Sequence, residues 1–143
     1  MKHAWGMTLL AGASATLFFI PQPARAQACK DETDMVDGSR QAVVEFTATV
    51  QKESLAEFEA HDHQKTAVNR LDMHTEMLGE LIDCLDKASQ DTTATKEAAT
   101  TAKTQHDAIV KLLDKVKEQD AAIKGAKASK EAKALVEKID LAP

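Results

Sequence analysis

Aromatic residues are scarce in this chain of 143 residues, which has no tyrosine, one tryptophan and four phenylalanines. Trp5, Phe18 and Phe19 all fall within the first 28 positions, so only Phe46 and Phe58 follow. Proteins that bind bases, sugars or flat cofactors usually stack them on aromatic faces. The composition therefore argues against a function that depends on such stacking.

Proline and glycine are also scarce, with three and five residues. Beyond position 28 they are limited to Pro143, Gly38, Gly79 and Gly125. Turn-rich chains use far more of both residues. Alanine, leucine, lysine and glutamate are abundant instead, and these residues favour helices. The composition predicts an all-α protein.

The chain also lacks the motifs of common enzymes and any excess of positive charge. It has no Cys-x-x-Cys pair, no His-Glu-x-x-His motif, no nucleophile elbow and no glycine-rich phosphate loop. Its formal net charge is -5, whereas nucleic-acid binding depends on a basic patch. We therefore expect a non-enzymatic protein that does not bind nucleic acid.

The N-terminal segment is typical of an export signal. A basic start at Lys2 precedes an apolar run over 4–20, and residues 26–28 (Ala-Gln-Ala) match the small-x-small pattern that signal peptidase cuts after. The run is too short and too poorly flanked to predict a membrane span. We expect removal of residues 1–28, a single domain over 29–143, and a periplasmic or secreted location.

Along the rest of the chain, apolar and small residues recur at steps of three and four, the spacing of helices in a bundle. Three such stripes predict a helix over about 63–88, a second over about 92–124, and a short final helix that reaches position 142. In order, the stripes are Ala67, Leu71, His74, Leu78, Leu81 and Leu85; Ala98, Ala102, Gln105, Ile109, Leu112, Val116, Gln119 and Ile123; and Ala128, Ala132, Leu135, Ile139 and Ala142.

The first helical segment is less regular. An apolar face over 36–58 predicts a helix that begins near Ser39, a residue type that commonly caps helices. The polar stretch 57–64 predicts a turn, and a single helix over 39–88 is the alternative. A second turn is predicted over 89–93, where serine, aspartate and threonine residues cluster.

The two cysteines, Cys29 and Cys84, both lie beyond position 28. In an oxidising compartment an even number of cysteines indicates a disulfide, which requires Cα atoms within about 7 Å. A straight helix over 39–88 would be about 75 Å long and would keep the two cysteines apart. A turn near 59–63 instead brings Cys84 back beside the loose segment predicted over 30–37. Acylation of Cys29, as in a bacterial lipoprotein, is the alternative.

Residues that could bind a metal occur at two places. His61 and His63 lie in the predicted turn on either side of an aspartate, and imidazole and carboxylate ligands suit zinc, copper or nickel. Met73 and Met77, together with His74, could hold a soft ion such as Cu(I). The competing interpretation is structural, because turn histidines are usually solvated and His74 falls in a core stripe.

Together these patterns predict an antiparallel all-α bundle of three longer helices plus a short C-terminal helix. We expect it to act through helix-mediated protein interaction, as an adaptor, by self-association or in a holdase-like envelope-stress role. Binding of a copper, zinc or nickel ion by the histidines and methionines is the alternative. The lysine-rich segment 126–143 is expected to pack loosely and to offer a peripheral contact to the cell envelope.

Overall fold

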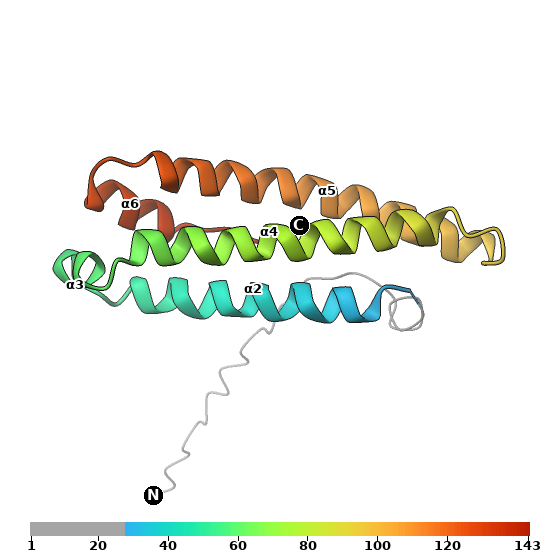
Figure 1. Ribbon diagram of the computed structural model, residues 1–143, viewed down its shortest axis with the longest axis horizontal. Coiled ribbons are helices and arrows are strands. Elements are labelled where there is room, and N and C mark those ends of the chain that lie inside the picture. Colours follow the sequence, from blue (N-terminus) through green and yellow to red (C-terminus); the bar gives the residue numbers. More distant parts are fainter. Residues whose placement is uncertain (1–27) are drawn as a thin grey trace, which may run out of the picture.

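The computed structural model describes residues 28–143 and contains helices but no strand in that part of the chain (Figure 1). Except for Ala28, the predicted export signal lies outside the described residues. The helices are α2 (Lys30–Val50), α3 (Leu55–Ala60), α4 (His63–Ser89), α5 (Lys96–Gly125) and α6 (Ser129–Val136). The predicted all-α bundle is confirmed. None of these described helices combines the length and apolar character that a membrane span requires.

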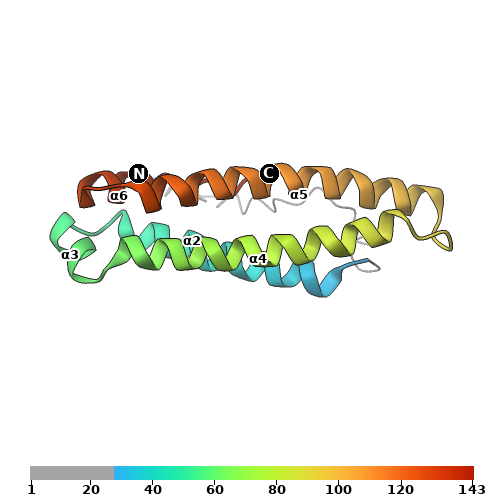
Figure 2. The ribbon, with the colours of Figure 1, turned by 45° about the horizontal axis from the view of Figure 1, so that its top comes forward.

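Helix α4 is the central element of the bundle. Helices α2 and α5 run along either side of it, and α3 and α6 lie at the same end of the bundle (Figures 1 and 2). Helix α4 packs extensively against both α2 and α5, whereas α2 and α5 hardly contact each other directly. Helix α6 folds back after α5 and packs against α3, α4 and α5. The long helices therefore share one core, which α4 organises.

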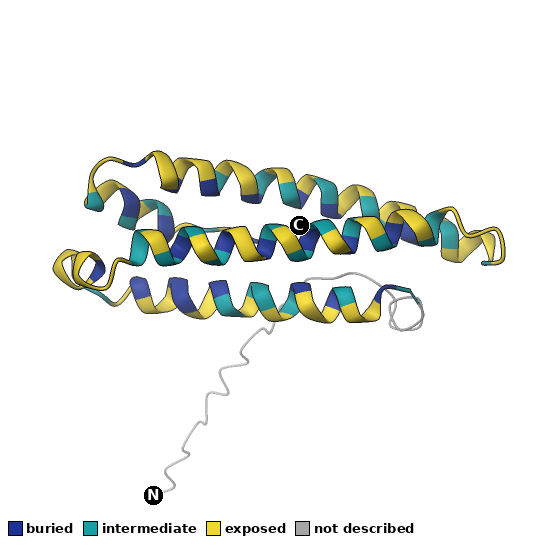
Figure 3. Ribbon diagram, in the orientation of Figure 1, coloured by how far each residue is buried: buried dark blue, intermediate teal, exposed yellow. Residues whose placement is uncertain are grey.

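The buried face of α4 is the predicted stripe. All six predicted positions are buried, from Ala67 near one end to Leu85 near the other, and Figure 3 shows buried patches along the helices where they face one another. Leu71 and Leu78 are fully buried, and each such side chain contributes about 1.5–3 kcal/mol relative to exposure. On α5, the prediction holds for Ala102, Ile109, Leu112, Val116 and Ile123, while Gln105 and Gln119 are half-buried and Ala98 is exposed.

Helix α2 begins earlier than predicted. The segment 30–37, predicted to be loose, is helical because α2 starts at Lys30. Val36, part of the predicted apolar face, is buried, and the buried Thr33 extends that face toward the N-terminus. Ser39, predicted as the N-cap, lies inside the helix, where its hydroxyl donates to the carbonyl of Val36 at 2.9 Å. Ser39 is thus a polar position within a helix and not its beginning.

Two changes of direction separate α2 from α4. After α2 ends at Val50, Ser54 and Glu57 form a capping box at the start of α3: the Ser54 hydroxyl accepts from the Glu57 N–H at 3.2 Å, and the Glu57 carboxylate accepts from the Ser54 N–H at 2.7 Å. Asp62, with a left-handed φ of 52°, then leads the chain into α4. The predicted hairpin is confirmed, and the alternative of one helix over 39–88 is wrong.

The other end of this hairpin is closed by the cysteines. Cys29 and Cys84 form a disulfide pair with Cα atoms 5.8 Å apart, which confirms the predicted pairing. The two residues are separated by 55 positions in sequence, and closing a loop of this length stabilises the fold by roughly 4 kcal/mol in the chain-entropy model. The bond ties the start of α2 to the C-terminal part of α4.

The boundaries of α5 and α6 differ from those predicted. Helix α5 begins at Lys96, and not near position 92, because the Thr95 hydroxyl caps it by accepting from the Ala98 N–H at 3.2 Å. Helix α6 ends at Val136 and does not reach position 142. Leu141 is buried although it lies beyond the helix.

Polar contacts hold residues 137–143 against α5. The side-chain amide of Gln119 donates to the carbonyl of Asp140 at 2.9 Å and accepts from its N–H at 2.7 Å. The Lys115 ammonium lies 2.5 Å from the Asp140 carboxylate and donates to the carbonyl of Ala142 at 3.0 Å. The hydrogen bond from Lys115 keeps the pKa of Asp140 below its ordinary value.

Candidate metal centre

Three side chains with metal-binding atoms meet where the chain passes from α2 into α4, a segment we call the elbow (residues 51–63). Glu53 lies in the turn after α2, His61 ends α3, and His63 begins α4. The Nδ1 of His63 lies 2.7 Å from Oε2 of Glu53, and the Nδ1 of His61 lies 3.5 Å from Oε1. Ligand atoms of all three residues lie within 4.8 Å of one another. We call Glu53, His61 and His63 the elbow triad.

The shortness of α3 brings the triad together. The helix has six residues, so its two ends lie close to each other. Glu53 immediately precedes its cap, Ser54, and His61 follows its last residue. The left-handed backbone of Asp62 then returns His63 to the side of Glu53, and the two histidine ring centroids are 5.1 Å apart.

Packing fixes His63 and Glu53 more firmly than His61. The His63 ring meets Phe46 and Phe58 edge-on, with centroid distances of 5.2 and 6.1 Å. The side chains of His63 and Glu53 are 15% and 14% exposed, whereas that of His61 is 57% exposed. Two members of the triad are therefore largely buried, His63 against the core and Glu53 against His63, and the third approaches from the solvent side.

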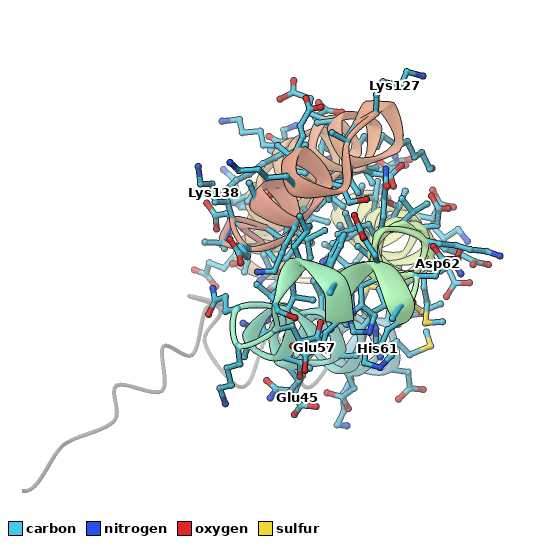
Figure 4. The ribbon with its side chains drawn as sticks, turned by 90° about the vertical axis from the view of Figure 1, so that its left-hand side faces the viewer. Glu45, Glu57, His61, Asp62, Lys127 and Lys138 are labelled. Atoms are coloured by element: carbon cyan, nitrogen blue, oxygen red, sulfur yellow. A yellow bond between two sulfur atoms is a disulfide. The ribbon has the colours of Figure 1, made fainter. Side chains whose placement is uncertain are left out.

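The neighbouring carboxylates do not complete the triad. The carboxylate of Glu57 accepts hydrogen bonds from the N–H and the hydroxyl of Ser54, at 2.7 and 2.8 Å, and these bonds lower its pKa. Figure 4, which views the bundle from the elbow end, places Glu57 and Asp62 on opposite sides of His61. The arrangement offers three protein ligands at a site that faces solvent.

The donor set determines which ions the triad can hold. Two imidazole nitrogens and one carboxylate oxygen are ligands for Zn²⁺, Cu²⁺ and Ni²⁺. Three protein ligands leave a coordination position for water or another molecule, whereas structural zinc sites commonly use four protein ligands. Without an ion, the same groups close the elbow through the hydrogen bond between His63 and Glu53.

The fold divides the second predicted cluster. His74 is fully buried with its Nδ1 2.7 Å from the Ser39 hydroxyl, whereas Met73 is 57% exposed and Met77 packs partly buried against the core. Burial, with a smaller contribution from the charge of Arg40, lowers the pKa of His74 to about 4. The ring is therefore neutral at pH 7 and lies on the core side of α4, away from the solvent that Met73 faces.

Two other groups of potential ligands have different roles. Cys29 and Cys84 lie close to Glu32, but the disulfide occupies both sulfur atoms. On α5, His106 lies 3.1 Å from the carboxylate of Asp107, and this hydrogen bond lowers the pKa of Asp107. Neither group brings together several unoccupied nitrogen and oxygen ligands as the elbow does.

Glu53 is the member of the triad that sequence reasoning missed. It precedes His63 by ten positions, and nothing in the spacing of apolar residues relates the two. The signal that could have located it is the Ser54-x-x-Glu57 pattern, which marks the start of a helix. That pattern would have predicted α3 and placed Glu53 directly before it.

Comparison with known proteins adds no match, whether to a protein-family model, a curated protein or a solved structure. The geometry of the elbow and the chemistry of its side chains therefore indicate what this site can bind.

Proposed function

We propose that this protein is a non-catalytic helical bundle that binds a divalent transition-metal ion (copper, zinc or nickel) at the elbow triad. One observation carries the proposal: the ligand atoms of Glu53, His61 and His63 lie within 4.8 Å of one another. Imidazole nitrogens favour these ions over Mg²⁺ and Ca²⁺, which take oxygen ligands. The packing of His63 against Phe46 and Phe58 supports the proposal, because a ligand that is already held in place loses little freedom on binding.

The number of ligands favours reversible binding. A structural ion is normally enclosed by four protein ligands, whereas the triad supplies three and leaves the ion open to solvent. His61, with an exposed side chain, is the ligand most able to move away. The proposed role is therefore to take up and release an ion and not to hold one permanently.

We place this binding outside the cytoplasm. The N-terminal signal predicted over 1–28 supports export, and a disulfide between Cys29 and Cys84 is compatible with an oxidising compartment. The disulfide also uses the Cys29 sulfur that acylation would require, so the proposal does not include a lipid anchor. With both cysteines paired, histidine and carboxylate side chains are the remaining strong ligands for a divalent ion.

Calorimetric titration of Cu²⁺, Zn²⁺ and Ni²⁺ into the tag-free, disulfide-intact protein tests the proposal. We expect one ion per chain, and at least about tenfold weaker binding in Glu53→Gln and His61→Ala, because even residues behind the ligands are worth ten- to hundredfold in affinity. His106→Ala is the matched control, since it removes a histidine beside a carboxylate elsewhere. Circular dichroism checks that each variant keeps its helices.

Two results would overturn the proposal. The first is the lack of any binding tighter than micromolar for all three ions. The second is an equal loss of affinity in His61→Ala and in His106→Ala, which would indicate unspecific binding to surface histidines.

Helix-mediated interaction is the second candidate function, and one observation favours it. Helices α2 and α5 flank α4 with hardly any direct contact, so each keeps a long face outside the shared core. The partner we consider is a second copy of this chain. Sedimentation over a concentration series should then show a dimer at high concentration, and a monomer throughout would contradict self-association.

The predicted contact of the C-terminal segment with the envelope has less support. Lys127 and Lys138 lie at different edges of the bundle in Figure 4, and Lys133 pairs with Glu137. The positive charges of this segment are therefore dispersed and partly neutralised. They do not form the continuous basic patch that an acidic surface would bind best.

A further inference from the structure

The register of α2 against α4 places a third methionine beside the two that the sequence analysis considered. The disulfide and the contact between Ser39 and His74 show that the two helices are antiparallel and that each step forward on α2 matches one step back on α4. One turn from that contact, toward the disulfide, Met35 of α2 is level with Met77 of α4 and its neighbour Leu78. The three methionines of the described residues therefore lie on the same pair of helices.

These methionines also lie on one side of that pair. A surface hollow of ≈ 320 Å³ between α2 and α4 is lined by Ser39, Ala42, Thr66, Asn69, Arg70 and Met73. Met35 precedes Ser39 by four residues and Met77 follows Met73 by four, so each continues the same helix face by one turn. Met73 therefore lines the hollow, and Met35 and Met77 lie one helical turn from its lining residues, toward the disulfide end.

We propose that Met35, Met73 and Met77 form a binding site for a soft monovalent metal ion, Cu(I) in the first instance. Thioether sulfur is a soft, uncharged ligand that selects Cu(I) over Zn²⁺ and Mg²⁺. The unbranched methionine side chain has three rotatable bonds and adapts readily to a bound ion. The site differs from the sequence prediction in one ligand: Met35 replaces His74, whose ring is buried and held by Ser39.

Exposure of these side chains supports the site. Met35 and Met73 are 41% and 57% exposed, and they are two of the four exposed large hydrophobic residues in the described part of the chain. Met77 is partly buried and packs against the core. The side chains of Met35 and Met73 are therefore open to solvent, and Met77 lies between them and the core.

The methionine site is separate from the elbow triad. Met73 lies ten residues along α4 from His63, which corresponds to about 15 Å of helix, so one ion cannot bind at both places. The two sites also differ in ligand type, with thioether sulfur at one and imidazole and carboxylate at the other. The proposed methionine site does not depend on the proposed function, so an experiment can disprove one of the two sites while the other stands.

Titration with Ag(I), a soft monovalent ion that needs no reductant, tests the site. The protein is labelled with ¹³C at the methionine methyl groups and followed by NMR. We expect the methyl signals of all three methionines to shift together and to stop changing at one Ag(I) ion per chain. Met35→Leu should weaken Ag(I) binding at least about tenfold, the minimum expected for loss of a direct ligand.

A matched control separates position from sulfur content. Val44 is exposed on α2 and lies nine residues from Met35, half a turn away around the helix. Adding Val44→Met to the Met35→Leu variant restores the number of thioethers without restoring the site, so Ag(I) binding should remain weak. His61→Ala should leave the methyl shifts unchanged. Shifts confined to Met73 and Met77, unchanged affinity in Met35→Leu, or recovery of affinity on adding Val44→Met would each overturn the proposal.

Discussion

The two ends of the α2–α4 hairpin are closed by different chemistry. At one end a disulfide joins Cys29 and Cys84, which are 55 positions apart in sequence. At the other end the two arms of the elbow are joined by hydrogen bonds between residues close in sequence, among them Glu53 with His63, which are ten positions apart. A distant closure removes much chain entropy from the unfolded state, whereas a local closure removes little. The end of the hairpin whose residues are distant in sequence is thus closed by a covalent bond. The elbow end, whose residues are close in sequence, carries side chains that can bind a metal.

Breaking the covalent end should have the largest effect. Replacing both Cys29 and Cys84 with serine should lower the free energy of unfolding by about 4 kcal/mol, because the unfolded chain regains the entropy of the open loop. Urea denaturation followed by circular dichroism measures the change. Reductant should lower the midpoint of the wild type and leave the double variant unchanged. A urea midpoint of the wild type that is the same with and without reductant would contradict the disulfide.

Acid should weaken the middle of the hairpin through His74. Burial lowers the pKa of His74 from 6.5 to about 4, so between these pH values the unfolded chain binds a proton that the folded chain does not. The free energy of unfolding should therefore fall by about 3 kcal/mol from this residue as the pH drops from above 6.5 to below 4, and this contribution levels off at lower pH.

Urea denaturation at pH 7, 5.5 and 4 measures this dependence. His74→Gln removes the titrating group and should flatten the slope, although the variant is less stable at pH 7. His106→Gln, which removes a surface histidine, should keep the wild-type slope. Equal slopes in the wild type and in His74→Gln would show that the buried imidazole does not control the acid response.

Ion binding should strengthen the elbow end. At a free-ion concentration one hundred times the dissociation constant, a bound Zn²⁺ should raise the free energy of unfolding by about 2.7 kcal/mol. The gain should persist in the double cysteine variant, because the two ends of the hairpin are closed independently. In Glu53→Gln, where binding is at least about tenfold weaker, the gain should fall to about 1.4 kcal/mol or less at the same ion concentration, and an undiminished gain in that variant would place the ion elsewhere.

Removing the cap of α3 should have the smallest effect on stability and a specific effect on binding. Ser54→Ala should cost about 1 kcal/mol, as is typical for the loss of an N-cap. Thr95→Ala removes the equivalent cap from α5 and should cost a similar amount. Only Ser54→Ala should weaken Zn²⁺ binding, because Ser54 lies beside Glu53. Calorimetry compares the two, and equal affinities would mean that the cap does not position the triad.

The difference between contacts that are local in sequence and contacts that are distant also explains how much of the fold the sequence predicts. The stripe from Ala67 to Leu85 predicts the buried face of α4 in full, because one long helix with a regular core keeps a single period. The start of α2 was misplaced, since Ser39 resembles an N-cap and its true role depends on His74, 35 positions away. A local pattern cannot reveal a polar side chain whose partner lies on another helix.

The candidate site was predicted only in part, for a similar reason. His61 and His63 are close in sequence and therefore close in space, but Glu53 joins them through α3, a helix too short to show an apolar period. The separation of His74 from Met73 follows from the turn of about 100° between adjacent helix positions, which directs one side chain inward and the other toward solvent. Which of the two is buried depends on the phase of the core stripe.

Pulsed electron paramagnetic resonance of the Cu²⁺-loaded protein tests the central claim most directly, because it detects the nitrogen nuclei of imidazoles bound to the ion. The elbow triad predicts signals from two coordinated imidazoles in the wild type and in His106→Ala, and from one in His61→Ala. A wild-type spectrum without imidazole coordination, or one that His61→Ala leaves unchanged, would contradict a metal centre at the elbow.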